Sequence, residues 1–108
     1  MSTDPLRAGM DAKKELDRLE REVQAIGEFY LEVGKGLSVS PPRLMLANSG
    51  LSTRTGLDDA RMVDFTKWPE KDTVKEKLAE FYEAETAYAQ AYRYVPAEER
   101  DGFPKPNP

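Results

Sequence analysis

The acidic residues in the second half of the chain are the side chains that could carry chemistry. Glu85 occupies a position in a regular apolar pattern where an apolar residue is expected. Two converging carboxylates can act as a general acid and base or hold a hard metal ion. The candidates to converge with Glu85 are Glu28, Glu32, Glu80 and Glu83. A carboxylate buried alone is costly, so we interpret Glu85 as a structural residue that fixes helix register against an arginine such as Arg21.

The residues on which most enzymes and metal sites depend are missing from the sequence. The chain contains no cysteine and no histidine. It therefore has no thiol nucleophile, disulfide or thiolate ligand, and it lacks the commonest general base at neutral pH. The Glu-x-x-His motif of di-iron helical bundles is excluded for the same reason. We predict that the protein is not an enzyme and has no catalytic residue, cofactor or metal.

Tyrosine is concentrated in one short segment. Tyr82, Tyr88, Tyr92 and Tyr94 all lie within this segment. Tyrosine is enriched in protein interfaces because it buries a large area at a small entropic cost. Tyr82 and Tyr94 lie off the apolar pattern and are predicted to face a partner, whereas Tyr88 and Tyr92 are predicted to be core residues. The predicted protein interface consists of Phe29, Leu31, Tyr82, Tyr94 and Phe103.

The segment from Gly50 to Gly56 superficially resembles an anion-binding loop. It lacks the Gly-Lys-Ser/Thr ending that gives a P-loop its grip on phosphate. Turn chemistry, or a phosphorylation site next to Arg54, explains the segment better than nucleotide binding.

A first helix is predicted over residues 5–35. Asp4 suits the N-cap, Pro5 suits the first helical position, and Gly34 with Gly36 favours an end. The apolar residues of this helix alternate steps of three and four, which is the spacing of a coiled-coil seam. The first seam consists of Leu16, Leu19, Val23, Ile26, Tyr30 and Val33.

A second helix is predicted over residues 69–95, where Pro96 favours its end. Its seam repeats the same spacing, with Glu85 in the middle. The second seam consists of Val74, Leu78, Phe81, Tyr88 and Tyr92. Because the two seams match in length, we expect a long antiparallel helical hairpin.

The remaining segments are predicted to lack regular structure. Pro41 and Pro42 interrupt any helix, so residues 37–68 are expected to form an irregular connector. A short helix over residues 57–65 could follow Thr55 and Asp58, which have the spacing of a capping box. Residues 101–108 are expected to form an extended, proline-rich tail. The predicted fold is therefore all-α, with residues 1–108 as one helical-hairpin domain.

Composition limits the partners. The chain has 33% charged residues and a net charge of −4, with no strongly basic region. We therefore expect no binding to nucleic acid. No segment has the apolar length of a membrane span, and the first 20 residues lack the apolar centre of a secretory signal. We expect a cytoplasmic protein that does not insert into membranes.

Two functions from different classes are compatible with these features. The first is a non-catalytic protein–protein interaction, in which the chain is a structural or adaptor subunit of a larger assembly or a homo-oligomer. A two-helix hairpin leaves a second apolar stripe that needs a cover, which favours this function. The alternative is a small acidic inhibitor or regulator that occupies a basic site on a nucleic-acid-acting enzyme. The modest net charge argues against that alternative.

The helix lengths also resemble those of the secreted WXG100 hairpins. Tyr94 to Glu98 fits the Tyr-x-x-x-Asp/Glu tail signal of that family. However, Trp68-Pro69-Glu70 departs from the Trp-x-Gly turn, and the connector is much longer than that turn. We therefore assign no membership in this family.

Overall fold

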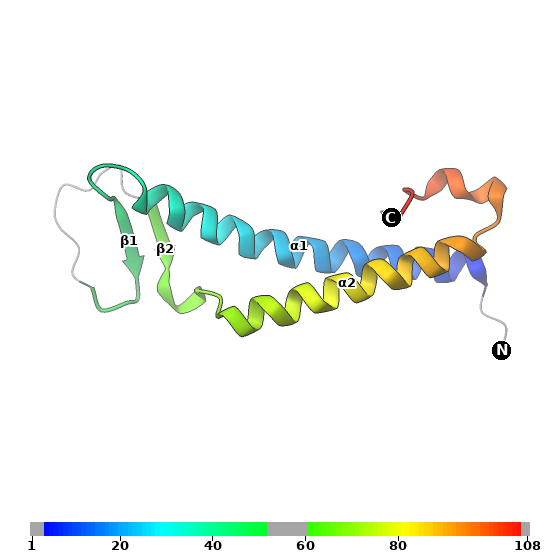
Figure 1. Cartoon of the computed structure of the whole chain (residues 1–108), viewed down its shortest axis with the longest axis horizontal. Coiled ribbons are helices and arrows are strands. Elements are labelled where there is room, and N and C mark those ends of the chain that lie inside the picture. Colours follow the sequence, from blue (N-terminus) through cyan, green and yellow to red (C-terminus); the bar gives the residue numbers. More distant parts are fainter. Residues whose placement is uncertain (1–3, 52–60, 107–108) are drawn as a thin grey trace. The chain divides into compact units, whose positions relative to one another are not determined.

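A computed structural model describes residues 4–51 and 61–106. The elements follow in the order α1 (Pro5–Leu37), β1 (Leu44–Ala47), β2 (Arg61–Asp64), η1 (Phe65–Lys67), α2 (Lys71–Tyr94) and η2 (Ala97–Gly102), as Figure 1 shows. The chain divides into two compact units. Unit 1 comprises Met1–Val23 and Val74–Pro108, and unit 2 comprises Gln24–Thr73.

The first predicted helix is confirmed as α1, with a longer C-terminal end. Its start follows the expected cap, because the backbone N–H of Leu6 donates to Oδ1 of Asp4 at 3.0 Å. Its end lies at Leu37 because Gly34 and Gly36 continue the helix, and the N–H of Ser38 still donates to the carbonyl of Gly34 at 2.9 Å. Glycine disfavours a helix interior only by about 1 kcal/mol, which packing readily offsets.

Gly36 has a role at the end of α1 that the pattern did not predict. A Cβ atom at this position would lie 2.9 Å from Cδ1 of Leu44 and 3.1 Å from the carbonyl oxygen of Arg43. The absence of a side chain therefore lets the first residue of β1 approach the helix.

Unit 1 is built from the first part of α1, nearly all of α2, and the C-terminal segment, with α1 and α2 packed against each other. Leu19, Ala84, Tyr88 and Val95 are buried in it. A Cβ atom at Gly9 would lie 2.8 Å from Cγ2 of Val95, so the start of α1 closely approaches the end of α2. The second predicted helix is thus confirmed as α2, which begins at Lys71 and ends at Tyr94.

Charged side chains surround this core on the surface of unit 1. Arg18 pairs with Glu15 at 2.5 Å and with Glu22 at 3.1 Å, and Lys77 reaches Glu22 at 3.5 Å and Glu80 at 3.4 Å. Lys13 pairs with Asp17 one helical turn away. Exposed pairs of this kind each add at most about 1 kcal/mol, so the apolar core carries most of the stability of unit 1.

Unit 2 contains a small sheet, which corrects the prediction of an all-α fold with an irregular connector. β1 and β2 pair in parallel, with Leu44 opposite Arg61 and Ala47 opposite Asp64. The short helix predicted over residues 57–65 is wrong from residue 61 onward, because residues 61–64 form β2 and Phe65 begins η1. Its first part, with Asp58 and the Thr55 cap, lies outside the described residues.

An aromatic cluster joins α1 to η1 within unit 2. The rings of Phe29 and Trp68 lie edge to face at 5.5 Å, and Phe65 contacts Trp68 at 6.1 Å. The hydroxyl of Tyr30 donates to the carbonyl of Pro69 at 2.8 Å. Such contacts add roughly 0.5–1.5 kcal/mol per ring pair beyond the area that they bury. They add packing to a unit whose two short strands alone would be marginal.

Neither described helix combines the length and the apolar character that a membrane span requires.

Candidate protein-interaction sites

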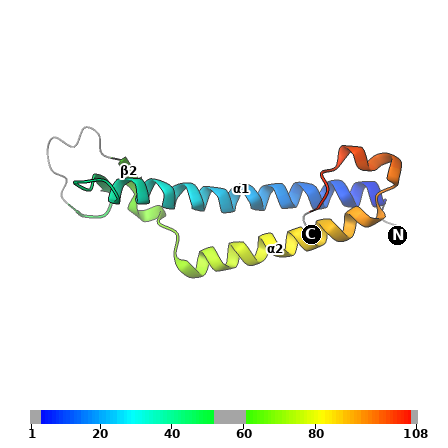
Figure 2. The ribbon, with the colours of Figure 1, turned by 45° about the horizontal axis from the view of Figure 1, so that its top comes forward.

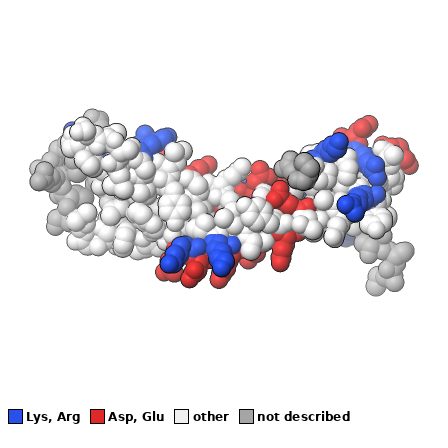
Figure 3. Space-filling view, viewed as in Figure 1, with Lys and Arg blue, Asp and Glu red and all other residues white. Residues whose placement is uncertain are grey.

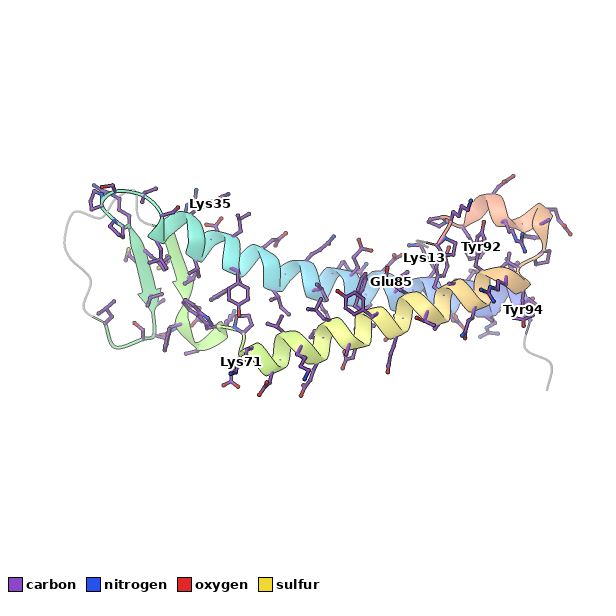
Figure 4. The ribbon with its side chains drawn as sticks, in the orientation of Figure 1. Lys13, Lys35, Lys71, Glu85, Tyr92 and Tyr94 are labelled. Carbon is purple, nitrogen blue, oxygen red and sulfur yellow. The ribbon has the colours of Figure 1, made fainter. Side chains whose placement is uncertain are left out.

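A groove on unit 1 is occupied by the C-terminal segment of the chain. We call it the tail groove. It holds a cavity of about 200 Å³. The cavity is lined by Lys13, Leu16 and Glu20 of α1, by Glu85 and Tyr88 of α2, and by Pro104, Lys105 and Pro106 of the C-terminal segment. Figure 4 shows Lys13 and Glu85 on the side of unit 1 where this segment lies.

Tyr88 provides the specific contact in the tail groove. Its side chain is 2% exposed, as expected for a seam residue, and its hydroxyl donates to the carbonyl oxygen of Pro104 at 2.5 Å. Burial raises the pKa of the Tyr88 phenol, because the ionised form would lose hydration there. The neutral hydroxyl is therefore retained as a hydrogen-bond donor through the physiological pH range.

Arg100 directs the chain from α2 back toward the tail groove. Its guanidinium donates from Nε to the carbonyl of Val95 and from Nη2 to the carbonyl of Arg93, both at 3.0 Å. The same group lies 5.3 Å from the centre of the Tyr92 ring. Unpaired carbonyls at the end of a helix favour a cationic donor of this kind. The sequence analysis missed this residue, and the only available signal was an arginine shortly after the expected helix end.

Phe103 contacts its own chain, although it was predicted to be an interface anchor. Its ring lies 3.4 Å from the position that a Cβ atom at Gly9 would occupy. The segment η2 lies beside the first turns of α1 in both Figure 1 and Figure 2. The half-buried ring therefore fastens the tail to unit 1, and the tail is not wholly extended because η2 reaches Gly102.

Glu85 forms no ion pair with Arg21 in the part of the chain that the structure describes. It is half-buried and lines the tail groove with two lysines. Two of the other candidate carboxylates have cationic partners, because Glu32 pairs with Arg61 at 2.7 Å and Glu80 pairs with Lys77 at 3.4 Å. Within residues 4–51 and 61–106, no three acidic side chains are grouped in a way that could hold a metal ion.

The predicted seams largely face inward. Leu19, Val33 and Tyr88 are buried, while Tyr30 is 39% exposed. The half-buried seam positions are Leu16, Val23, Ile26, Val74, Leu78, Phe81 and Tyr92. Leu31, Tyr82 and Tyr94, which were predicted to face a partner, are 55%, 57% and 74% exposed, whereas Phe29 is half-buried against Trp68.

A second candidate site is the set of exposed apolar side chains on unit 2. We call it the apolar surface of unit 2. It consists of Tyr30, Leu31, Leu37, Val39, Leu51, Met62 and Phe65. Exposed apolar groups of this size and number are typical of interaction sites when they are contiguous.

Asp64 holds together the turn that follows β2. Its Oδ1 accepts from the hydroxyl of Thr66 at 2.6 Å, from the Thr66 N–H at 3.0 Å and from Nδ2 of Asn48 at 3.3 Å. The Thr66 hydroxyl, followed by the Asn48 amide and the Thr66 N–H, lowers the pKa of the Asp64 carboxyl below its ordinary value. The contribution of this carboxylate to stability is therefore full above the ordinary aspartate pKa of about 4 and is lost as the pH falls through the lower folded value.

The lowered pKa of Asp64 predicts that unit 2 loses stability as the pH falls. Between about pH 5 and pH 2, we expect the unfolding midpoint in urea to fall more steeply for the wild type than for Asp64→Asn. Trp68, the single tryptophan, reports on unit 2 by fluorescence. Asp101→Asn is the control, because Asp101 lies exposed in η2 of unit 1. Equal pH slopes for the wild type and Asp64→Asn would contradict the role of Asp64.

No family model matches the chain, and no curated protein or solved structure is similar to it.

Proposed function

We propose that this chain is a non-catalytic protein-binding subunit, a structural or adaptor component of a larger assembly or of a homo-oligomer. The observation that carries the proposal is the distribution of exposed apolar side chains. Of the ten large hydrophobic residues that are exposed in the described part of the chain, seven lie in unit 2. In this proposal α1 and α2 pair in an antiparallel coiled-coil arrangement as a spacer, and unit 2 provides the contact.

The charge pattern of unit 2 supports the same proposal. Between Gly36 and Leu51 the only charged residue is Arg43. In Figure 3, the face of unit 2 that carries β1 and β2 is mostly free of charged atoms. A surface with few charges is inexpensive to desolvate, and depletion of charge is typical of the centre of an interface.

The free energy available from burying these apolar side chains favours a stable contact. Burying an exposed Leu, Met or Phe side chain completely contributes about 1.5–3 kcal/mol. Met62 and Leu51 are 65% and 63% exposed, so even partial burial of the apolar surface of unit 2 recovers several kcal/mol. That gain offsets the entropic cost of association, which is of the same order.

The alternative is an acidic inhibitor of a nucleic-acid-acting enzyme. It would need carboxylates gathered on one face without nearby cations, because only such a face attracts a basic site. On unit 1, Arg18 and Lys77 are interleaved with Glu15, Glu22 and Glu80. This mixed pattern favours the adaptor function over the inhibitor.

The proposal is tested by the mass of the complexes that the protein forms. For the wild type at about 50 µM, we expect light scattering to give a mass above that of the 12.2 kDa monomer, or a pull-down to retain a stoichiometric partner. Leu31→Glu combined with Met62→Glu places two charges on the apolar surface of unit 2 and is expected to abolish either complex, with at least a tenfold loss of affinity.

Met10→Glu is the matched control, because Met10 is 47% exposed on unit 1 and is not among the predicted interface residues. Circular dichroism of each variant shows whether its helices are retained. A monodisperse monomer that retains no partner would contradict the proposal. So would a complex that is unaffected by the two glutamates.

A further inference from the structure

The occupant of the tail groove identifies the kind of ligand that the groove fits. Pro104 and Pro106 have no backbone N–H, and their rings fix φ near −65°, so the segment can present only carbonyl acceptors on a stiff backbone. Tyr88 supplies the matching donor at 2.5 Å from the Pro104 carbonyl oxygen. Aromatic walls with a hydroxyl or indole donor are a recurring way to recognise such a backbone.

Charge adds a second element of recognition. Lys105 stands between the two prolines and lines the same groove as Glu20 and Glu85. Lys13 lines it as well, but it is ion-paired with Asp17. Glu85 therefore provides a carboxylate in the groove for a cation that is flanked by prolines, and this chemistry is complementary to a Pro-Lys-Pro sequence.

The tail forms one side of the groove, and side chains of α1 and α2 form the other. The tail is fastened outside the groove, by Phe103 against Gly9 and by Arg100 on the carbonyls that end α2. Within the groove, a single hydrogen bond holds Pro104 among the described residues. A segment of the same chemistry can thus take the place of the tail against α1 and α2.

We propose that the tail groove is a binding site for a proline-rich, basic segment of a partner protein, and that the chain's own Pro104–Pro106 occupies it as an autoinhibitory competitor. This inference rests on the proposed protein-binding function and names the chemistry of one partner. A segment tethered this closely has an effective concentration on the order of millimolar. A partner segment must bind tightly enough to displace the tail, so release of the tail regulates access to the groove.

The test uses the full-length chain and the free peptide Phe-Pro-Lys-Pro-Asn-Pro as the probe. Two variants are designed to release the tail from the groove, and we call them the unlocked chains. One carries Pro104→Gly together with Pro106→Gly, and the other carries Phe103→Gly, which removes the contact of the ring with α1. We expect both unlocked chains to bind the peptide at least tenfold more tightly than the wild type does, as measured by chemical-shift titration. Introducing Tyr88→Phe into the unlocked chain is expected to weaken binding about fivefold, the equivalent of one hydrogen bond.

Two controls make the result specific. Tyr82→Phe in the unlocked chain is expected to leave peptide binding unchanged, because Tyr82 is not among the residues that line the groove. A peptide with glutamate in place of lysine is expected to bind at least threefold more weakly. The inference is overturned if neither unlocked chain binds the peptide saturably while its helical circular dichroism is intact. It is also overturned if the unlocked chain binds the peptide equally well with Tyr88 and with Tyr88→Phe.

The result is separable from the proposed function. The tail groove lies wholly in unit 1, so peptide binding is expected to persist in the Leu31→Glu, Met62→Glu variant. If peptide binding is absent while the complex still depends on Leu31 and Met62, only the autoinhibited groove is rejected. If the peptide binds but those two positions have no effect, the apolar surface of unit 2 is rejected and the groove remains.

Discussion

Replacing Tyr88 with alanine is expected to lower the free energy of unfolding by about 3–5 kcal/mol, the range found when large aromatic residues are removed from protein cores. Tyr88 is 2% exposed, and its ring lies 6.1 Å from that of Tyr92. The substitution removes a ring from the centre of unit 1 and also the donor to Pro104. A loss of this size is a large fraction of the total stability of an ordinary domain.

The measurement is urea denaturation followed by circular dichroism, since α2 and the first part of α1 provide most of the signal of unit 1. Tyr94→Ala is the matched control, because Tyr94 lies on the same helix and is 74% exposed, projecting from the end of α2 in Figure 4. We expect it to change stability by no more than about 0.5 kcal/mol. Equal losses for the two tyrosines would show that Tyr88 is not a core residue.

Tyr88→Phe separates packing from the hydrogen bond. The ring stays, so only the hydroxyl is lost, and the expected destabilisation is about 1 kcal/mol. If Tyr88→Phe were as damaging as Tyr88→Ala, the contact with Pro104 would be the dominant contribution and the ring would be secondary.

The two helices were predictable because their signals are long and repeated. Six seam residues of α1 alternate steps of three and four, and so do the five of α2 together with Glu85. Asp4 with Pro5 marks a start that the Leu6 to Asp4 hydrogen bond confirms. The heptad pattern also identified Leu19 and Tyr88 as core positions. Such patterns are local, so they are readable without knowledge of the tertiary structure.

The sheet was not predictable for the opposite reason. Each strand has four residues, which is too short for a period of two to be distinguished from chance. Leu44–Ala47 reads as a short apolar run, and its partner Arg61–Asp64 contains a charge at each end. The strands form through the pairing of two segments that are distant in the sequence.

The tail groove was not predictable either, because it also depends on contacts between segments that are distant in the sequence. Lys13, Glu85 and Pro104 come from three separate segments, and no spacing in the sequence relates them. The sequence predicted a proline-rich tail with Phe103 as an interface residue, but it could not show that Phe103 and Pro104 contact their own chain. Similarly, Arg100 became recognisable only from the carbonyls that it reaches.

Val63→Asp is expected to destabilise unit 2 by about 3–5 kcal/mol, whereas Met62→Asp is expected to cost no more than about 1 kcal/mol. The two residues are neighbours on β2, but Val63 is 7% exposed and Met62 is 65% exposed, because successive side chains of a strand point to opposite faces. At position 63 the new carboxylate must be buried without a cationic partner or be protonated, and both cost free energy.

Fluorescence of Trp68 in urea and amide exchange of β1 and β2 report this difference directly. The comparison also tests the correction of the predicted helix, because the contrast between neighbours follows from the alternation of a strand and the register of Met45 with Met62. Equal effects at the two positions would reject the strand. With the expected result, Met62→Asp becomes a folded variant that changes only the apolar surface of unit 2, and any loss of complex that it causes is a loss of binding and not of structure.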